Sequence, residues 1–205
     1  VIAGGPKALA AATEASEDSR QLGRHEISKR RPGRNDVVVG IAASGRTPFT
    51  VAAIQQARRK GAKTVAVTCN RNSALEKAAH LAIVTEVGPE VLAGSSRLKA
   101  GTAQKLVLNM LSTGAMTRLG YVYGNLMVNV HLKNKKLMER GIGILEEVAS
   151  IGRERARKAL QEGGSVAVAL VMLKKRVNRA TAERALRLSR GNVREAIARA
   201  RRELH

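Results

Sequence analysis

The sequence predicts an α/β domain, built on a parallel sheet flanked by helices, followed by a small all-helical domain. Between residues 36 and 85, short apolar runs alternate with helical patterns, as in parallel strands joined by crossover helices. After Gly124 no further strand pattern is convincing, and the remaining patterns are helical. The sequence starts at Val1, inside an apolar stretch, so we expect the α/β domain to be incomplete at its N-terminus. The expected domains are 1–130 and 131–205.

The elements of the first domain follow from apolar spacing and from the residues that start and end helices. The run from Asp36 to Ile41 is short and β-branched, which is typical of a strand covered on both faces. Pro48 suits a first helical turn, and Gly61 suits the residue after a helix end. The expected elements are helix 6–22, strand 36–41, helix 48–60, strand 64–68, helix 73–79, strand 81–85 and helix 97–119. The last of these carries an apolar stripe of Ala103, Leu106, Val107, Met110, Leu111 and Met116.

The second domain contains a weak internal repeat of a helix, a glycine turn and a second helix. Ala159-Leu160 and the turn at Gly164 are echoed by Ala185-Leu186 and the turn at Gly191. A separate helix over 134–150 precedes the repeat. All of these patterns predict helices, so this part is expected to be a helical appendage.

Composition limits the classes of function. Lys and Arg total 37 against 16 Asp and Glu, a net charge of +21, which favours anionic partners. Only 1% of residues are aromatic, so few side chains could stack on bases, and nucleic acid is not expected as a partner. The single cysteine, Cys69, excludes an intrachain disulfide and fits a reducing cytoplasm. No apolar run approaches the ~20 residues of a membrane-spanning helix, so no membrane is expected. The densest basic cluster, interpreted as a solvated loop, is Arg24, Lys29, Arg30, Arg31 and Arg34.

A strand-to-helix turn is the first candidate binding site. Ser44, Gly45, Arg46 and Thr47 come where a parallel strand meets the N-terminus of its helix, a position whose free N–H groups attract anions. Gly45 would let the backbone approach a phosphate, while the hydroxyl groups and the guanidinium would donate hydrogen bonds. The alternative is an ordinary turn with Thr47 as the helix N-cap. The turn is no Walker loop, because the G-x-x-x-x-G-K-[ST] pattern is absent.

Two further stretches could carry chemistry. The acidic segment at Glu14, Glu17 and Asp18 brings carboxylates together, where repulsion can raise a pKa, although an exposed acidic turn of an amphipathic helix is the favoured interpretation. Ser95, Ser96 and Lys99 crowd the start of helix 97–119, where they could bind a second anion or simply cap the helix. The four histidines share no ligand spacing, so no metal is expected.

Several of these segments occur in the order seen in one known family. The chain resembles the bacterial N-acetylmuramic acid 6-phosphate etherases, of the sugar isomerase (SIS) superfamily, over essentially its whole length. This resemblance implies a SIS-type parallel sheet and cleavage of a lactyl ether to N-acetylglucosamine 6-phosphate and D-lactate in cell-wall recycling. The matching segments are Glu14-x-x-Glu17-Asp18-Ser19, Val38 to Pro48, Gly94 to Thr113, and Gly124 to Val128.

The resemblance also implies the roles of individual residues. Elimination of lactate needs a base for the proton at C2 and an acid for the leaving oxygen, a task for two carboxylates. Glu17 corresponds to the base, with Glu14 as a fallback. The residues implied in binding the phosphorylated amino sugar are Ser44, Gly45, Arg46 and Thr47 for its 6-phosphate, and Ser95, Ser96 and Lys99 for further contacts. No metal or organic cofactor is implied, and a cytoplasmic homodimer is expected.

The resemblance leaves two alternatives open. Family members have an earlier region with the first strand and the glutamate that serves as the acid, so this chain is expected to be a fragment that could be inactive. A related SIS-domain regulator would bind a sugar phosphate without catalysis. A nucleic-acid-binding module would instead use the helix pairs of 153–203 to contact phosphates.

Overall fold

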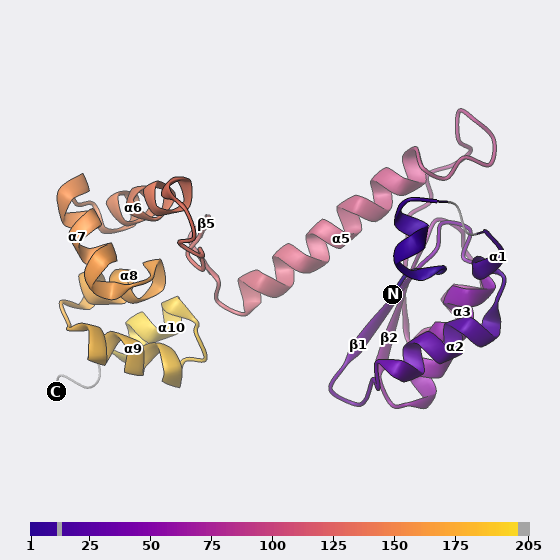
Figure 1. The fold of residues 1–205 in the computed structure, drawn as a ribbon, viewed down its shortest axis with the longest axis horizontal. Coiled ribbons are helices and arrows are strands. Elements are labelled where there is room, and N and C mark those ends of the chain that lie inside the picture. Colours follow the sequence, from indigo (N-terminus) through magenta and orange to yellow (C-terminus); the bar gives the residue numbers. More distant parts are fainter. Residues whose placement is uncertain (12–13, 201–205) are drawn as a thin grey trace. The chain divides into compact units, whose positions relative to one another are not determined.

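A computed structural model describes residues 1–11 and 14–200 of the chain. Its packing forms two compact units, Val1–Met110 and Leu111–His205. The division falls within helix α5 (Lys99–Arg118), which Figure 1 shows as one continuous helix. The expected domain boundary at residue 130 stays a prediction.

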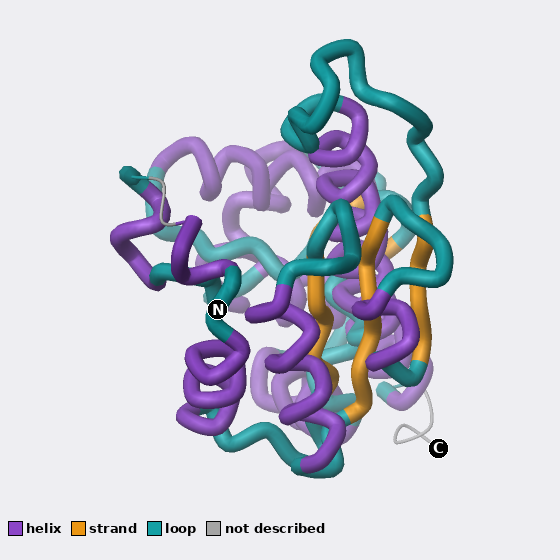
Figure 2. The backbone as a smooth tube through the Cα atoms, turned by 90° about the vertical axis from the view of Figure 1, so that its right-hand side faces the viewer, coloured by secondary structure: helices purple, strands orange, loops and turns teal. Residues whose placement is uncertain are grey.

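The first unit is built on a three-stranded parallel sheet (Figure 2). Strands β1 (Val37–Ile41), β2 (Lys63–Thr68) and β3 (Leu81–Val84) lie in the order β1-β2-β3, with Val39 opposite Val65 and Val65 opposite Leu81. The prediction of parallel strands joined by crossover helices is therefore confirmed, and the carboxyl ends of all three strands lie at the same edge.

Helices α3 (Pro48–Arg59) and α4 (Ala74–Ala78) pack against the sheet and form its core. Ile54 of α3 and Leu75 of α4 are fully buried, and both pack with Ala66 of β2. As predicted, Pro48 occupies the first turn of α3, and Gly61 follows its end with a φ of 88°. Residues without a side-chain penalty for left-handed backbone are preferred at that point, which explains the glycine.

Strand β1 is not covered on both faces, and this part of the prediction is wrong. It is an edge strand of the sheet, Val37 is 63% exposed, and Val39 and Ile41 are only half-buried. On β3, Leu81 is 60% exposed. A continuous β-branched run thus marks a strand here, but its second face is less buried than the sequence suggests.

The N-terminal region is not one helix over 6–22. The structure contains a 3₁₀ helix, η1 (Gly5–Leu9), followed by α1 (Glu14–Glu17) and α2 (Arg20–Lys29). The break comes at Ser19, whose hydroxyl accepts a hydrogen bond of 3.1 Å from Leu22 N and so caps α2. Because α2 continues to Lys29, the interpretation of the basic cluster as a loop is wrong for Arg24 and Lys29. Helix α2 packs closely on α3, since a Cβ at Gly23 would overlap the Phe49 backbone.

Helix α5 presents its apolar stripe to solvent over most of its length. Val107 and Ala100 are its buried residues, whereas Leu106 is 50% and Met110 is 65% exposed. No charged residue occurs between Lys105 and Arg118. Uncharged apolar faces of this length are commonly covered by other parts of a protein or by a partner.

The second unit is helical apart from a small hairpin. Its core centres on Leu145, Val166 and Leu170, which are fully buried. The two predicted helix–glycine–helix repeats are confirmed, and Gly164 and Gly191 both have left-handed backbone. The hairpin was not predicted, because strands of two residues are too short to show an alternation of apolar and polar residues. The elements are β4 (Val122–Tyr123), β5 (Leu126–Met127), α6 (Lys135–Ala149), α7 (Arg153–Gly163), α8 (Val166–Lys175), α9 (Arg179–Leu188) and α10 (Val193–Arg199).

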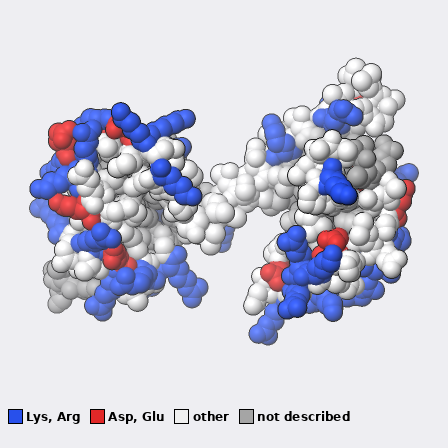
Figure 3. All heavy atoms as spheres, viewed as in Figure 1, with Lys and Arg blue, Asp and Glu red and all other residues white. Residues whose placement is uncertain are grey.

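On the face shown in Figure 3, groups of Lys and Arg side chains occur on both units. Within the part of the chain that the structure describes, no helix combines the length and the apolar character needed to cross a bilayer.

Candidate functional site

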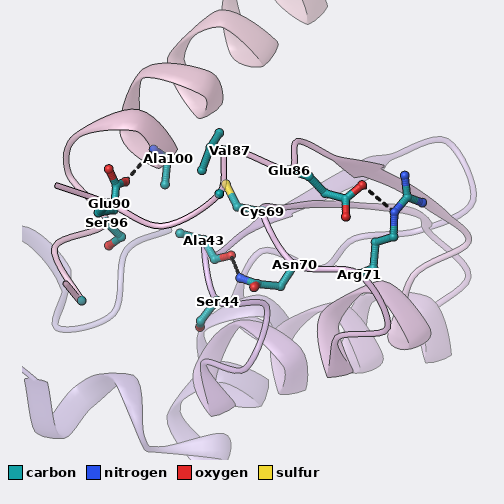
Figure 4. A pocket seen from close by; sticks show the side chains of 12 residues that line it. Ala43, Ser44, Cys69, Asn70, Arg71, Glu86, Val87, Glu90, Ser96 and Ala100 are labelled. Atoms are coloured by element: carbon teal, nitrogen blue, oxygen red, sulfur yellow. Dashed lines mark hydrogen bonds and ion pairs between the residues drawn. The ribbon is translucent and has the colours of Figure 1, made fainter. Parts of the chain in front are cut away.

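A pocket of about 400 Å³ lies at the carboxyl ends of the three parallel strands (Figure 4). This is the edge at which open α/β sheets bind ligands. Its walls come from the segments that follow β1, β2 and β3 and from the first turn of α5. The lining residues are Ala43, Ser44, Cys69, Asn70, Arg71, Glu86, Val87, Gly88, Glu90, Gly94, Ser96 and Ala100.

The turn after β1 is held against the end of β2. The carbonyl oxygen of Ala43 accepts hydrogen bonds from Cys69 N at 2.9 Å, Asn70 Nδ2 at 2.9 Å and Thr68 Oγ1 at 3.2 Å. Gly45 is buried with a φ of 64°, and a side chain there would overlap Ser73 and Thr68. Glycine is therefore required at this position by both its backbone angle and its neighbours.

The N-terminus of α3 follows this turn directly. Thr47 occupies the N-cap position, but its side chain makes no capping hydrogen bond, so its interpretation as an ordinary N-cap is wrong. Helix geometry leaves the N–H groups of Phe49 and Thr50 without intrahelical acceptors. Ser44, which is exposed, lies next to these groups, and its Oγ accepts a hydrogen bond of 3.2 Å from Arg46 N. Donors of this kind bind phosphate at helix N-termini in other proteins.

The N-terminus of α5 is occupied by a side chain of the protein itself. The carboxylate of Glu90 accepts a hydrogen bond of 3.0 Å from Lys99 N and one of 2.9 Å from Ala100 N, and Figure 4 shows the second of these. The bond from Ala100 and then that from Lys99 hold the pKa of Glu90 below its usual range. Capping by Ser95 or Ser96, the alternative suggested by the sequence, is thus wrong: Glu90 takes that role.

An ion pair forms the other side of the pocket. Arg71, which follows β2, donates from Nε to Oε2 of Glu86, which follows β3, at 2.6 Å. Sequence reasoning missed Arg71, Glu86 and Glu90. The position of the first two after predicted parallel strands could have indicated them, because such segments meet at one edge of the sheet.

The structure brings some of the predicted site residues together and leaves others apart. Ser44 and Ser96 line the pocket, and the amine of Lys99 lies beside Gly88 at its wall. Gly45 follows Ser44 in the turn and is buried, so it does not line the pocket itself. The pocket lining does not include Arg46, Thr47, Ser95 or the proposed base Glu17.

Glu17 is exposed on α1, and α1 contacts α3. Since Gly23 of α2 packs on Phe49 in the first turn of α3, the acidic segment lies toward the end of α3 that carries Thr47. The side chain of Glu14, the fallback base, lies outside the described residues. Among the residues that the structure describes, His, Cys, Asp and Glu form no group of three that could hold a metal ion.

Comparison with known proteins identifies the family. Residues 28–114 match the SIS domain, so the sheet and the pocket lie within that match. The chain is 46% identical over 198 residues to N-acetylmuramic acid 6-phosphate etherase 1 of Bacillus licheniformis, which covers 96% of this chain and 65% of that protein. The chain belongs to the N-acetylmuramic acid 6-phosphate etherase family.

Two other etherases are similar to this chain over most of its length. The etherase of Symbiobacterium thermophilum is 57% identical over 175 residues, 84% of this chain and 58% of that protein. The etherase of Pasteurella multocida is 48% identical over 198 residues, 96% of this chain and 66% of that protein. The chain therefore spans about two thirds or less of the length of these family members.

Proposed function

We propose that the protein cleaves the lactyl ether of N-acetylmuramic acid 6-phosphate and releases N-acetylglucosamine 6-phosphate and D-lactate, as a carbon–oxygen lyase of cell-wall recycling. The observation that carries this proposal is the pocket at the carboxyl ends of the strands, beside the open N-terminus of α3, in a chain of the etherase family. A non-catalytic regulator would share the pocket, but the similar curated proteins are named etherases.

The chemistry proceeds by elimination followed by addition of water. An ether is cleaved slowly by direct displacement, because an alkoxide is a poor leaving group. Removing the proton at C2 of the open-chain sugar, next to the C1 aldehyde, permits loss of the lactate oxygen from C3 once that oxygen is protonated. Water then adds at C3. The step needs a base and an acid whose pKa values differ.

The 6-phosphate is bound by the turn after β1. Ser44, Gly45 and Thr47 supply hydroxyl and N–H donors at the positive end of α3, and Arg46 adds a guanidinium. Ser96 lines the same pocket and Lys99 lies beside it, so with Ser95 they contact the sugar or its second anion, the lactyl carboxylate. Glu17 is the base. Its support is the family resemblance and the packing that places α1 on α3.

Labelled water tests the function directly. The chain is incubated with N-acetylmuramic acid 6-phosphate in ¹⁸O-labelled water, and the products are analysed by mass spectrometry. We expect the label in the sugar at C3 and none in D-lactate, and in deuterated water we expect deuterium at C2. Label in D-lactate would contradict the elimination route. Binding of the sugar phosphate without any release of D-lactate would support the regulator instead.

The phosphate assignment predicts a selective loss of affinity. Ser44→Ala combined with Thr47→Ala should weaken binding of N-acetylglucosamine 6-phosphate about tenfold or more, because two hydrogen bonds to a charged group are lost. Affinity is measured by isothermal titration calorimetry. Unphosphorylated N-acetylglucosamine is the control ligand, and its affinity should change little. An equal loss for both ligands would show that the turn does not bind the phosphate.

The proposal includes a cytoplasmic homodimer. The single cysteine, Cys69, is free, as in proteins of a reducing compartment. The exposed uncharged stripe of α5 can be covered by a second copy without bringing the positive charges of two chains into contact.

Charges on this stripe should dissociate the dimer. Leu106→Lys with Met110→Lys replaces two exposed apolar side chains per copy, and we expect the dimer dissociation constant to rise at least ~100-fold. Sedimentation analysis measures the change. Ala115→Lys is the control, because this exposed residue lies on the opposite side of the same helix. Unchanged association of the double variant would remove α5 from the interface.

A further inference from the structure

The segment between β3 and α5 forms one wall of the pocket and has few contacts of its own. We call residues 87–97 the wall loop. Val87, Gly88, Gly94 and Ser96 of this loop line the pocket. Val87 is half-buried at the pocket, but Val91 is 90% and Leu92 is 65% exposed, and Gly88 and Gly94 have left-handed backbone. Burial of side chains therefore contributes little to holding the wall loop in place.

The side chain of Glu90 ties this loop to the first turn of α5, where the carbonyl oxygen of Ser96 also accepts a backbone hydrogen bond of 2.9 Å from Gly101 N. The two carboxylate oxygens of Glu90 accept from the N–H groups of Lys99 and Ala100, the first two residues of α5. Hydrogen bonds from backbone N–H groups to a carboxylate are stronger than those between neutral groups, and the helix N-terminus adds a favourable field. The lowered pKa of Glu90 agrees with a carboxylate that stays ionised at this position.

The same contact distinguishes the two helix N-termini near the pocket. At α5 the first N–H groups already bind a carboxylate, whereas at α3 the Thr47 side chain leaves them open. An incoming phosphate would meet the negative charge of Glu90 at α5 and unpaired donors at α3. The position of Glu90 therefore favours the turn at Ser44 for the phosphate and leaves the wall loop to contact the sugar.

We infer that Glu90 is a positioning residue, which fixes the wall loop over the pocket and keeps the N-terminus of α5 from binding the substrate phosphate. The effect on the sugar phosphate rests on the proposed function, whereas the effect on the loop does not. Glu90 acts through the loop and through α5, and it takes no part in proton transfer.

Cys69 makes the loop observable without any ligand. It is the single cysteine of the chain, it lines the pocket, and its Sγ lies 3.4 Å from Thr85 Oγ1 at the end of β3. Its rate of alkylation by iodoacetamide therefore reports how well the wall loop covers the pocket.

The experiment compares Glu90→Ala, Glu90→Gln and Asn178→Ala in the full chain. Asn178 caps α9 in the second unit through a bond of 2.9 Å from Thr181 N, so its loss removes a helix cap that is unrelated to the pocket. We expect alkylation of Cys69 to be about tenfold faster in Glu90→Ala. The free energy of a hydrogen bond to a charged group corresponds to a factor of at least about ten in the population of the open loop. Glu90→Gln keeps one acceptor oxygen and should show a smaller increase, and Asn178→Ala should show none.

Calorimetry with N-acetylglucosamine 6-phosphate supplies the second readout. Affinity should fall about tenfold in Glu90→Ala and remain unchanged in Asn178→Ala. Equal alkylation rates in all variants would overturn the inference. If the parent chain binds N-acetylglucosamine 6-phosphate, faster alkylation of Glu90→Ala with an unchanged affinity for this ligand would also overturn it. If the parent chain does not bind the sugar phosphate, the proposed function fails, and the alkylation rates alone decide whether Glu90 holds the loop.

Discussion

Replacing Glu17 by Gln is expected to abolish D-lactate release while the sugar phosphate still binds. The amide has nearly the shape of the carboxylate but cannot accept the proton from C2, and without that proton transfer the lactate oxygen cannot leave. General bases contribute ~10²- to 10⁴-fold to rate, and we expect a fall of at least ~10³-fold here. Glu17 is exposed on α1, so its substitution should not disturb the core.

Two measurements separate a lost base from a lost fold. D-lactate release is followed with a coupled lactate dehydrogenase assay, and exchange of the C2 proton of N-acetylglucosamine 6-phosphate with deuterated water is followed by NMR. Both should fall together in Glu17→Gln, while the dissociation constant of the sugar phosphate changes less than about twofold. Asp18→Asn is the matched control, since Asp18 is also exposed and lies next to Glu17. Turnover near that of the parent chain in Glu17→Gln would remove Glu17 from the mechanism.

Glu17 lies outside the pocket lining, so its proposed role as the base restricts how the substrate can be bound. Glu17 lies on a helix of four residues, and Ser19 ends that segment by capping α2. A base must come within about 3 Å of the carbon-bound proton that it removes. The substrate must therefore extend from the turn at Ser44 across the end of α3 toward α1, or the second copy of the proposed dimer must supply its own Glu17.

The elements whose apolar residues recur at a regular spacing could be predicted from the sequence. The strands, α3 and the repeats of the second unit all have apolar spacing over several residues, and their ends carry Pro48, Gly61 or Gly164. The single helix predicted over 6–22 was wrong because apolar spacing continues across Ser19, whereas the hydroxyl of Ser19 caps a new helix. Helix caps of this kind compete with a continuous helix and override a weak period.

The candidate site could be predicted only in part, and the reason is physical. The turn at Ser44 has a local signal, because a strand, a glycine and Pro48 define it within a few residues. Glu90 has none: its carboxylate bonds to N–H groups 9 and 10 residues further along the chain, and the loop between them has no repeating pattern. Such contacts depend on how the loop folds back, which spacing does not reveal.

Replacing Gly45 by Ala is expected to lower the stability of the first unit strongly. The backbone at Gly45 has a φ of 64°, which costs a residue with a Cβ about 1 kcal/mol. The new methyl group would overlap the side chains of Ser73 and Thr68, and both of these residues are buried and held by hydrogen bonds. Relieving such an overlap costs a further ~1–3 kcal/mol, so we expect a total near 3 kcal/mol.

The measurement and its control must report on the first unit. Hydrogen exchange of the β1 and β2 amides in increasing urea gives the free energy of unfolding there, independently of the second unit. Gly33→Ala is the control, because a Cβ at Gly33 meets no atom within 4 Å and its backbone is not left-handed. Its stability should change by less than ~0.5 kcal/mol. If Gly45→Ala were as stable as Gly33→Ala, the turn would not need glycine, and the close packing of Ser44 and Gly45 against the end of β2 could not define the phosphate site.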